Sequence, residues 1–245
     1  MYFLLYKLLP LQHLPVKPIC MIGLVLIVAF SSCKKDDATP GTPNYEDGVS
    51  TVVYDLAGDT TTTVGGENAQ PFKTFYYSLK TSAVFRDTTD LDPKSLSWDL
   101  AFTGVYNSII YPNNGIAASS PGYGGEGKAA IVYYDAAYED VVLAPDNDYF
   151  TNNSLSFIGW DGYPQPYNTG WYFYEINTHI ATPIKNRTFV VRTAEGKYAK
   201  LEIINIYKGN PAVVTDLNWP TPYFTFRYYV QEDGSRNLYT PPATY

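Results

Sequence analysis

Few side chains of this chain could bind a metal or act in acid–base catalysis. The 245 residues contain two histidines, two cysteines and two methionines. His13 and both methionines lie within the first 21 positions, so His179 is the only histidine in the rest of the chain. An imidazole metal site or a Ser–His–acid arrangement there would depend on His179 alone. The same counts exclude a zinc site of several histidines and a scaffold of several disulfides.

No motif of a known catalytic class is present. The chain lacks Gly-x-Ser-x-Gly, His-Glu-x-x-His and the phosphate-binding P-loop. Gly122, Gly124 and Gly127 match Gly-x-Gly-x-x-Gly, but the strand-like residues 129–134 follow them where a dinucleotide site needs a helix. We therefore expect a binding protein and not an enzyme. Acidic residues beside prolines are expected to cap turns: Asp87, Asp90, Asp92, Asp146 and Asp148.

Aromatic side chains are the second group that could bind a ligand. They form 16% of the chain, and one run interleaves them with glycine and proline: Trp160, Tyr163, Tyr167, Trp171 and Tyr172. Because glycine and proline at this density do not continue a strand, some of these rings are expected on a loop. Exposed rings can stack on a flat ligand or a sugar. Packing of most of them in the core is the alternative.

The amino-acid composition favours β-strands as the elements that position these residues. Charged residues make up only 17% of the chain, whereas there are 24 tyrosines, 18 glycines and 18 prolines. Aromatic and β-branched residues suit strands, and glycine and proline suit turns. The formal net charge of −7 repels phosphate, so nucleic acid is not an expected partner.

Alternation of apolar and polar residues predicts an all-β, largely antiparallel domain. Trp98, Leu100 and Phe102 are expected to face inward together. In 223–231, Phe224, Phe226 and Tyr228 are expected to be buried opposite Thr225, Arg227 and Gln231, and in 197–207 Lys200 and Glu202 stand opposite apolar residues. The predicted strands are 51–57, 72–79, 97–103, 105–111, 128–134, 171–176, 187–193, 197–207 and 223–231.

Turn residues predict two hairpins. Ala194-Glu195-Gly196 would join 187–193 to 197–207 through a three-residue turn ending in glycine. Residues 232–235 would join 223–231 to a strand at 236–240. No twelve-residue window has a helical stripe, and 138–143 would form one or two turns at most.

The N-terminal segment resembles the signal of a bacterial lipoprotein. Residues 21–30 are an apolar run too short to span a bilayer, and Ser31, Ser32 and Cys33 follow it. We expect residues 1–32 to be the signal peptide and Cys33 to be lipidated. An uncleaved anchor and an ordinary secretory signal are the alternatives.

The residues after Cys33 indicate a surface tether. Lys34-Lys35-Asp36-Asp37 resembles the charged export tag of Bacteroidota lipoproteins, which favours the outer membrane and the cell surface. Residues 33–48 are expected to form a flexible tether, and residues 49–245 one β domain.

Several segments, taken in order, resemble the HmuY family of haem-binding, haemophore-like surface lipoproteins of Bacteroidota. They are SWDLAF (97–102), NNG (113–115), GYGGEGKA (122–129), GWYFY (170–174), TP (182–183), VVRTAEGKYAKLEI (190–203) and FTFRYYVQEDGSRNL (224–238). The resemblance implies an all-β fold that holds haem between projecting hairpins. It also implies a role in iron acquisition and a TonB-dependent outer-membrane transporter that receives the haem.

The resemblance also implies two axial iron ligands, paired His or paired Met, which this chain does not supply. His13, Met1 and Met21 all precede Cys33. His179 could hold the iron alone, or with a phenolate, since tyrosine can ligate haem iron; the candidates are Tyr149, Tyr163 and Tyr167. Alternatively, His179 is a solvent-facing loop residue. The chain would then bind a glycan on the aromatics between Trp160 and Trp171, or a protein partner.

Overall fold

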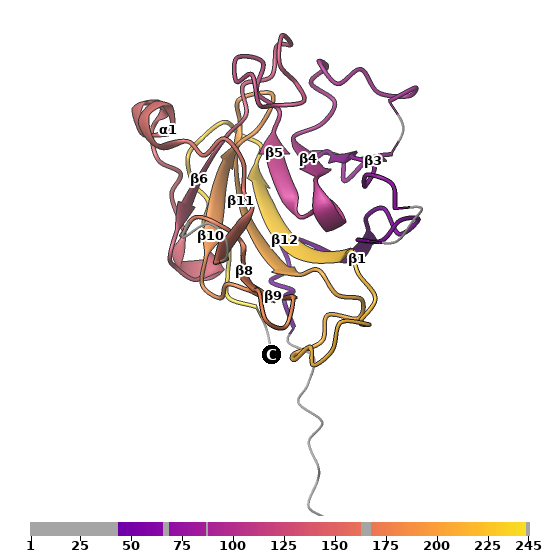
Figure 1. The fold of residues 1–245 in the computed structure, drawn as a ribbon. Coiled ribbons are helices and arrows are strands. Elements are labelled where there is room, and N and C mark those ends of the chain that lie inside the picture. The colour runs from indigo at the N-terminus through magenta and orange to yellow at the C-terminus, as the bar shows by residue number, and fades with distance from the viewer. Residues whose placement is uncertain (1–43, 66–68, 87, 163–167, 244–245) are drawn as a thin grey trace, which may run out of the picture. The chain divides into compact units, whose positions relative to one another are not determined.

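The main sheet has five antiparallel strands in the order β1-β12-β11-β10-β6 (Figure 1). The computed structural model describes residues 44–65, 69–86, 88–162 and 168–243, so the expected signal peptide, Cys33, Asp87, Tyr163 and Tyr167 lie outside the described residues. The strands are β1 Thr51–Ala57, β6 Ala130–Tyr134, β10 Thr188–Arg192, β11 Tyr198–Asn205 and β12 Tyr223–Gln231.

Two smaller sheets complete the fold. One has the order β3-β2-β4-β5, and the other has the order β7-β8-β9, in which β7 and β8 are parallel. Their strands are β2 Phe75–Tyr77, β3 Val84–Phe85, β4 Leu100–Thr103, β5 Ile109–Pro112, β7 Trp160–Gly162, β8 Tyr172–Glu175 and β9 Ile180–Pro183. The described helices are α1 Asn147–Asn153 and two single 3-10 turns, Val105–Asn107 and Tyr138–Asp140. The predicted all-β fold is confirmed.

The core lies between the β3-β2-β4-β5 sheet and the main sheet. Phe75 stacks on Phe102 with ring centroids 4.6 Å apart, and Phe102 meets Phe224 edge-on at 4.9 Å. Tyr77 meets Phe226 edge-on at 5.2 Å. The predicted inward face is therefore confirmed for these residues: Leu100, Phe102, Phe224, Phe226 and Tyr228.

Trp98 is buried elsewhere. Its ring lies 4.8 Å from that of Tyr76, in a separate buried cluster on the other face of the β3-β2-β4-β5 sheet, and its indole donates to the carbonyl of Pro93. The prediction that Trp98 shares a face with Leu100 and Phe102 is wrong. The strand starts only at Leu100, so the two-residue alternation does not extend back to position 98.

The polar faces of β11 and β12 are not open to solvent. Lys200 and Thr225 are fully buried and Arg227 is 5% exposed, which corrects the expectation of an exposed polar face. The segment that carries the Tyr138–Asp140 turn covers this face. Lys200 Nζ donates to the carbonyl of Tyr138 at 2.8 Å, and Arg227 pairs with Glu202 at 2.7 Å. Each buried cation thus keeps hydrogen-bond partners.

The hairpin between β10 and β11 is confirmed, with Gly196 at φ +89° closing its turn. The second predicted hairpin is wrong. Residues 236–240 pair with 142–144, where the amide of Leu238 donates to Val142 at 2.9 Å. On the edge of β12 away from β11, β1 pairs with Tyr223 to Tyr228, and residues 236–240 turn instead to the segment after the Tyr138–Asp140 turn.

The glycine-rich segment packs on the NNG segment. The amide of Gly115 donates to the carbonyl of Gly127 at 2.8 Å, and the amide of Gly124 donates to Gly115 at 2.8 Å. A Cβ on Gly127 would lie 2.4 Å from the carbonyl oxygen of Asn113, so this contact requires glycine. Strand β6 follows, as expected, where a dinucleotide site would need a helix.

Several short elements of the structure were not predicted from the sequence patterns. Helix α1 is capped by Asp146, whose side chain accepts the amide of Tyr149 at 2.8 Å, so Asp146 caps a turn as expected. Strands β3, β7 and β9 were not predicted, whereas the equally short β2, β4, β5 and β8 overlap longer predicted stretches. Across the described stretches, no helix combines the length and apolar character needed to cross a bilayer.

Candidate ligand-binding groove

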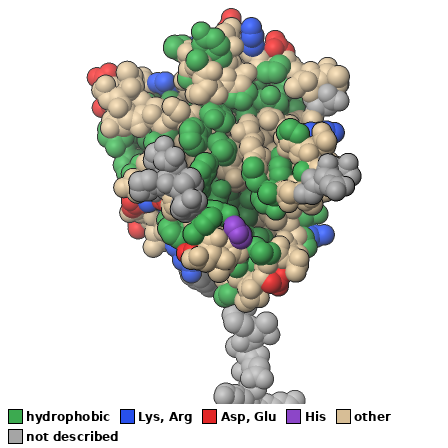
Figure 2. Space-filling view, in the orientation of Figure 1, with side chains coloured by type: hydrophobic (Ala, Val, Ile, Leu, Met, Phe, Trp, Pro, Cys, Tyr) green, Lys and Arg blue, Asp and Glu red, His purple; other side chains and the backbone are tan. Residues whose placement is uncertain are grey.

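A groove of 560 Å³ lies between the β7-β8-β9 sheet and the chain that follows β11. Apolar and aromatic side chains form most of its wall, and Figure 2 shows the hydrophobic side chains gathered around the histidine on this face. Val64, Val105 and Leu217 are each more than half exposed at this groove. Exposed apolar side chains around a concave surface are typical of a ligand site.

Strand β8 supplies one wall. Successive side chains of a strand point to opposite faces, so Tyr172 and Tyr174 both line the groove, whereas Phe173 lies on the outer face and is 45% exposed. Parallel pairing with β7 places Trp160 opposite Tyr172. The aromatic spacing of the GWYFY segment therefore creates an aromatic wall.

A buried ion pair fixes this wall to the main sheet. Arg187, which precedes β10, donates to Asp161 of β7 at 2.8 Å and to the carbonyl of Gly170 at 2.9 Å. Asp161 also accepts the amide of Gly170 at 2.7 Å. Both charged side chains are almost fully buried, and Arg187 also donates to the exposed Asp135 at 2.7 Å. Removal of Arg187 would therefore leave the Asp161 carboxylate buried without a cation.

Two groove tyrosines are neutral structural groups. Tyr172 Oη lies 3.1 Å from Ser108 Oγ, and Tyr207 Oη accepts the amide of Ala181 at 2.9 Å. Burial raises the pKa of both phenols above the ordinary value. Both therefore stay protonated at neutral pH.

Tyr174 and His179 form a hydrogen-bonded pair at the groove. Tyr174 Oη lies 2.5 Å from Nδ1 of His179, and the ring centroids are 6.0 Å apart. The turn between β8 and β9 brings them together, because the amide of His179 donates to the carbonyl of Glu175 at 2.7 Å. His179 has φ +56°, a left-handed conformation in which histidine is several-fold enriched.

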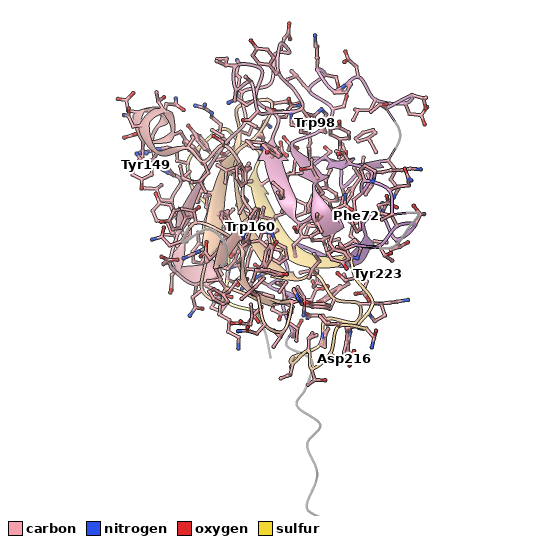
Figure 3. All side chains as sticks on the ribbon, viewed as in Figure 1. Phe72, Trp98, Tyr149, Trp160, Asp216 and Tyr223 are labelled. Carbon is pink, nitrogen blue, oxygen red and sulfur yellow. The ribbon has the colours of Figure 1, made fainter. Side chains whose placement is uncertain are left out.

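The structure brings together two of the residues selected from sequence, His179 and Trp160, which both line the groove. Trp171 is 1% exposed, donates from its indole to the carbonyl of Ser108 at 2.8 Å, and belongs to the core. Tyr149 lies on α1, away from Trp160 (Figure 3), and stacks on Tyr134 outside the groove.

Sequence reasoning missed Tyr174, together with Tyr106 and Tyr207, which also line the groove. For Tyr174 a signal was present. It is two residues from Tyr172 on a predicted strand, so it shares that face, and it stands five residues before His179, across a turn. A hairpin assignment for residues 172–183 would have placed His179 in the turn next to Tyr174, although the strand partner of Tyr174 is Ala181.

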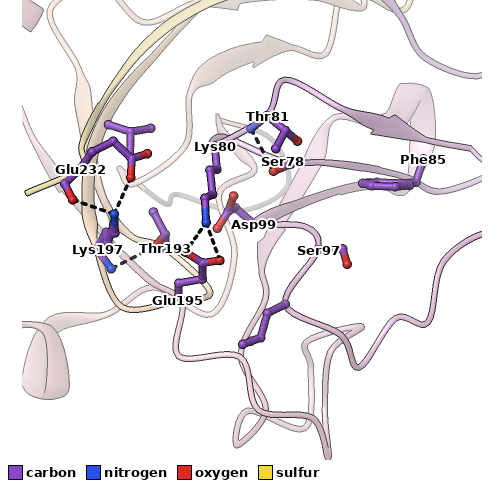
Figure 4. Close-up of a pocket in the computed structure, with 12 residues that line it drawn as sticks. Ser78, Lys80, Thr81, Phe85, Ser97, Asp99, Thr193, Glu195, Lys197 and Glu232 are labelled. Atoms are coloured by element: carbon purple, nitrogen blue, oxygen red, sulfur yellow. Dashed lines mark hydrogen bonds and ion pairs between the residues drawn. The ribbon is translucent and has the colours of Figure 1, made fainter. Parts of the chain in front are cut away.

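A second hollow of 420 Å³ lies at the β10–β11 turn (Figure 4). Its charged groups pair with each other, Lys80 with Glu195 and Lys197 with Glu232. The buried Asp99 accepts the amides of Leu79 at 2.8 Å and Ala194 at 2.9 Å, and burial raises the pKa of its carboxyl group. Asp99 thus ties the SWDLAF segment to the RTAEGK turn.

A family model described as HmuY protein matches residues 72–220, which is more than half of the chain. The chain belongs to the HmuY family. Of the groove residues, all but Val64 and Thr221 fall inside the HmuY match. The resemblance found in the motifs is therefore confirmed. A comparison with curated proteins finds no match.

Solved structures similar to this HmuY-family chain include three bacterial proteins. A protein of Bacteroides fragilis assigned as a lipoprotein is 15% identical, with 76% of this chain and 93% of that chain covered and a TM-score of 0.35. A Bacteroides vulgatus protein assigned as HmuY-like and haem-binding is 13% identical, with 77% and 96% covered and a TM-score of 0.39. The apo HmuY analogue of Tannerella forsythia is 14% identical, with 76% and 99% covered and a TM-score of 0.37.

Proposed function

We propose that this HmuY-family chain is a surface lipoprotein that binds haem, or a similar flat tetrapyrrole, in the groove and delivers it to a TonB-dependent outer-membrane transporter. It acts as a binding protein and not as an enzyme. The observation that carries the proposal is the apolar, aromatic groove with the Tyr174–His179 pair on it.

The groove residues suit haem. A volume of 560 Å³ lies within the range of small-molecule sites, about 300–1,000 Å³. The rings of Trp160 and Tyr106 offer apolar faces to a flat macrocycle. His179 and Tyr174 carry the two side-chain types, imidazole and phenol, that can ligate haem iron. The described lining contains no lysine or arginine, so the propionates of haem would remain in solvent.

The location follows from the N-terminal segment and the family. Residues 1–32 would direct export, Cys33 would carry the lipid, and residues 33–48 would hold the β domain, 49–245, away from the outer membrane. Several acyl chains on one cysteine hold a protein stably on a membrane, whereas one chain is marginal.

A glycan site is the alternative, since the chain after Cys33 lacks paired His or Met. Trp171 is buried, so a two-tryptophan platform with Trp160 does not form. The groove would then offer a sugar only one tryptophan.

Titration of the purified protein with haemin tests the proposal. We expect a sharp Soret change that saturates at one equivalent. Trp160→Ala should weaken binding, whereas Phe173→Ala, on the outer face of the neighbouring strand, should leave it unchanged. A featureless absorbance drift, or equal loss in both variants, would contradict the proposal.

A further inference from the structure

The phenol of Tyr174 and the imidazole of His179 are in direct hydrogen-bond contact, with 2.5 Å between Tyr174 Oη and His179 Nδ1. A phenol beside an imidazole can develop a negative charge, because the imidazole can accept the phenol proton.

The fold holds His179 in position for this contact at a cost. A non-glycine residue at φ +56° is uncommon, and strained backbone conformations persist where the surrounding structure enforces them, often at functional sites. Here the hydrogen bond from the His179 amide to Glu175 enforces the turn. The conformation places the imidazole against Tyr174 on the neighbouring strand.

Tyr174 differs from the other hydrogen-bonded phenols of the groove. Tyr172 and Tyr207 are buried, and Ser108 and the amide of Ala181 are their partners. Tyr174 is half-buried, and its described partner is a base. A phenol that donates its proton keeps its oxygen lone pairs free for another bond. Tyr174 is therefore the groove phenol best suited to act as a phenolate.

Resting on the proposed function, we propose that Tyr174, and not His179, is the iron ligand that this protein supplies to ferric haem, with His179 as its positioning residue. With haem bound, the O–H bond of Tyr174 would break and its proton would pass to Nδ1 of His179, in the tautomer that leaves Nδ1 unprotonated. The phenolate oxygen would hold the ferric iron in place of a water ligand, with no electron transferred.

This assignment accounts for the small number of histidines. A site with two imidazole ligands needs two histidines, and the chain has only His179 after Cys33. A phenolate ligand needs one tyrosine, and a base beside it can take the phenol proton and orient the oxygen. The Tyr174–His179 pair meets that requirement within a single hairpin.

Spectroscopic titration with two probes, ferric haemin and iron-free protoporphyrin IX, tests the proposal. The wild-type haemin complex should show phenolate-to-iron charge-transfer absorption and phenolate vibrations in resonance Raman spectra. Tyr174→Phe should remove both signatures and weaken haemin binding, yet keep wild-type affinity for protoporphyrin IX, because the groove is unchanged. Retained protoporphyrin binding also shows that the variant is folded.

Two further variants separate the roles. His179→Asn keeps a residue that tolerates positive φ. It should retain the phenolate signatures while haemin affinity falls roughly tenfold to hundredfold, as is typical when a partner that orients a metal ligand is removed. Tyr239→Phe removes a phenol that is 61% exposed and lies outside the groove, and it should change nothing.

The outcomes that overturn the proposal are distinct. One outcome is that the haemin complex of Tyr174→Phe keeps the wild-type spectrum, or that His179→Asn alone abolishes the spectral features of iron ligation. Imidazole is then the ligand, so this proposal fails while the proposed function stands. If wild-type protein binds neither probe, the proposed function itself fails. If it binds both equally and shows no phenolate signature, the groove takes the macrocycle without an iron ligand from Tyr174, and the proposal again fails.

Discussion

The guanidinium of Arg187 donates to the carboxylate of Asp161 at 2.8 Å, and this buried pair joins the groove wall to the main sheet. Loss of Arg187 leaves the Asp161 carboxylate buried without its cation, whereas Arg187 also pairs with Asp135 at 2.7 Å. The position of Trp160, the residue before Asp161, therefore depends on a contact between residues outside the groove lining.

Arg187→Met should destabilise the protein by about 3–5 kcal/mol, the usual cost of breaking a buried ion pair from one side. Denaturant unfolding followed by tryptophan fluorescence measures this. Lys80→Met, which breaks the exposed pair with Glu195, is the matched control and should have little effect. Similar losses in both variants would show that the buried pair has no special role.

Phe226→Ala should cost about 3–5 kcal/mol, because the ring is fully buried against Tyr77. Thr225 cannot serve as the control, since it is fully buried too. Thr51 is exposed on β1, and Thr51→Ala should be nearly neutral. Equal midpoints of urea unfolding for the two variants would contradict the assignment of the core face.

Stability should depend on pH through Lys200. Burial lowers the pKa of this ammonium group to about 8 from the ordinary 10.5, against the opposing influence of Asp47, Glu139 and Glu202. Between these two values the unfolded chain binds more protons than the folded protein, so the free energy of unfolding should rise with pH. Urea unfolding between about pH 7.5 and 9.5 measures the slope.

Lys200→Met is the control, because it removes the titrating group. The difference between the two pH slopes then excludes contributions from groups that both proteins share. The pH range ends at about 9.5 because of buried phenols such as Tyr138, whose pKa is raised by burial. At higher pH these phenols ionise in the unfolded chain, which lowers the free energy of unfolding. An equal slope in wild type and Lys200→Met would show that Lys200 does not titrate in this interval.

Membrane attachment should depend on Cys33. Expressed in a Bacteroidota host, wild type should partition with membranes and incorporate a fatty-acid probe. Cys33→Ala should lose the probe, because lipidation needs the thiol. Labelling of Cys33→Ala would remove the lipoprotein assignment.

The strands that could be predicted are those with a long alternating pattern. The bounds of β1 and β12 match the predicted 51–57 and 223–231. In β12 one alternating face packs on the core, whereas in β1 the core residues Val53 and Leu56 lie on either side of a register shift. The alternating pattern does not predict that the polar face of β12 is buried as well. Arg227 is covered by Tyr138 and Glu139, and Thr225 accepts the amide of Asp55, and all three of these residues are remote in sequence.

The candidate site was predictable only in part. His179 follows from counting histidines, and Trp160 from the density of aromatic residues. Tyr174 could not be chosen by type, since the chain has 24 tyrosines. Its partner, His179, is positioned by the turn 175–179, in which His179 itself has a positive φ. A glycine at such a position would have marked the turn in the sequence, whereas a histidine does not.

The pairing of β1 with β12 has a consequence for how the chain acquires its structure. Residues 51–57 pair with residues 223–231, so β1 cannot form its hydrogen bonds in the sheet until β12 is present. Contacts this remote in sequence slow folding, because a long loop must close before they form. In the export that we propose, which would begin at the N-terminus, β1 would therefore remain unpaired until nearly the whole chain had crossed the membrane. A chain that ends before Tyr223 would leave both β1 and β11 with an open edge, a ready template for aggregation.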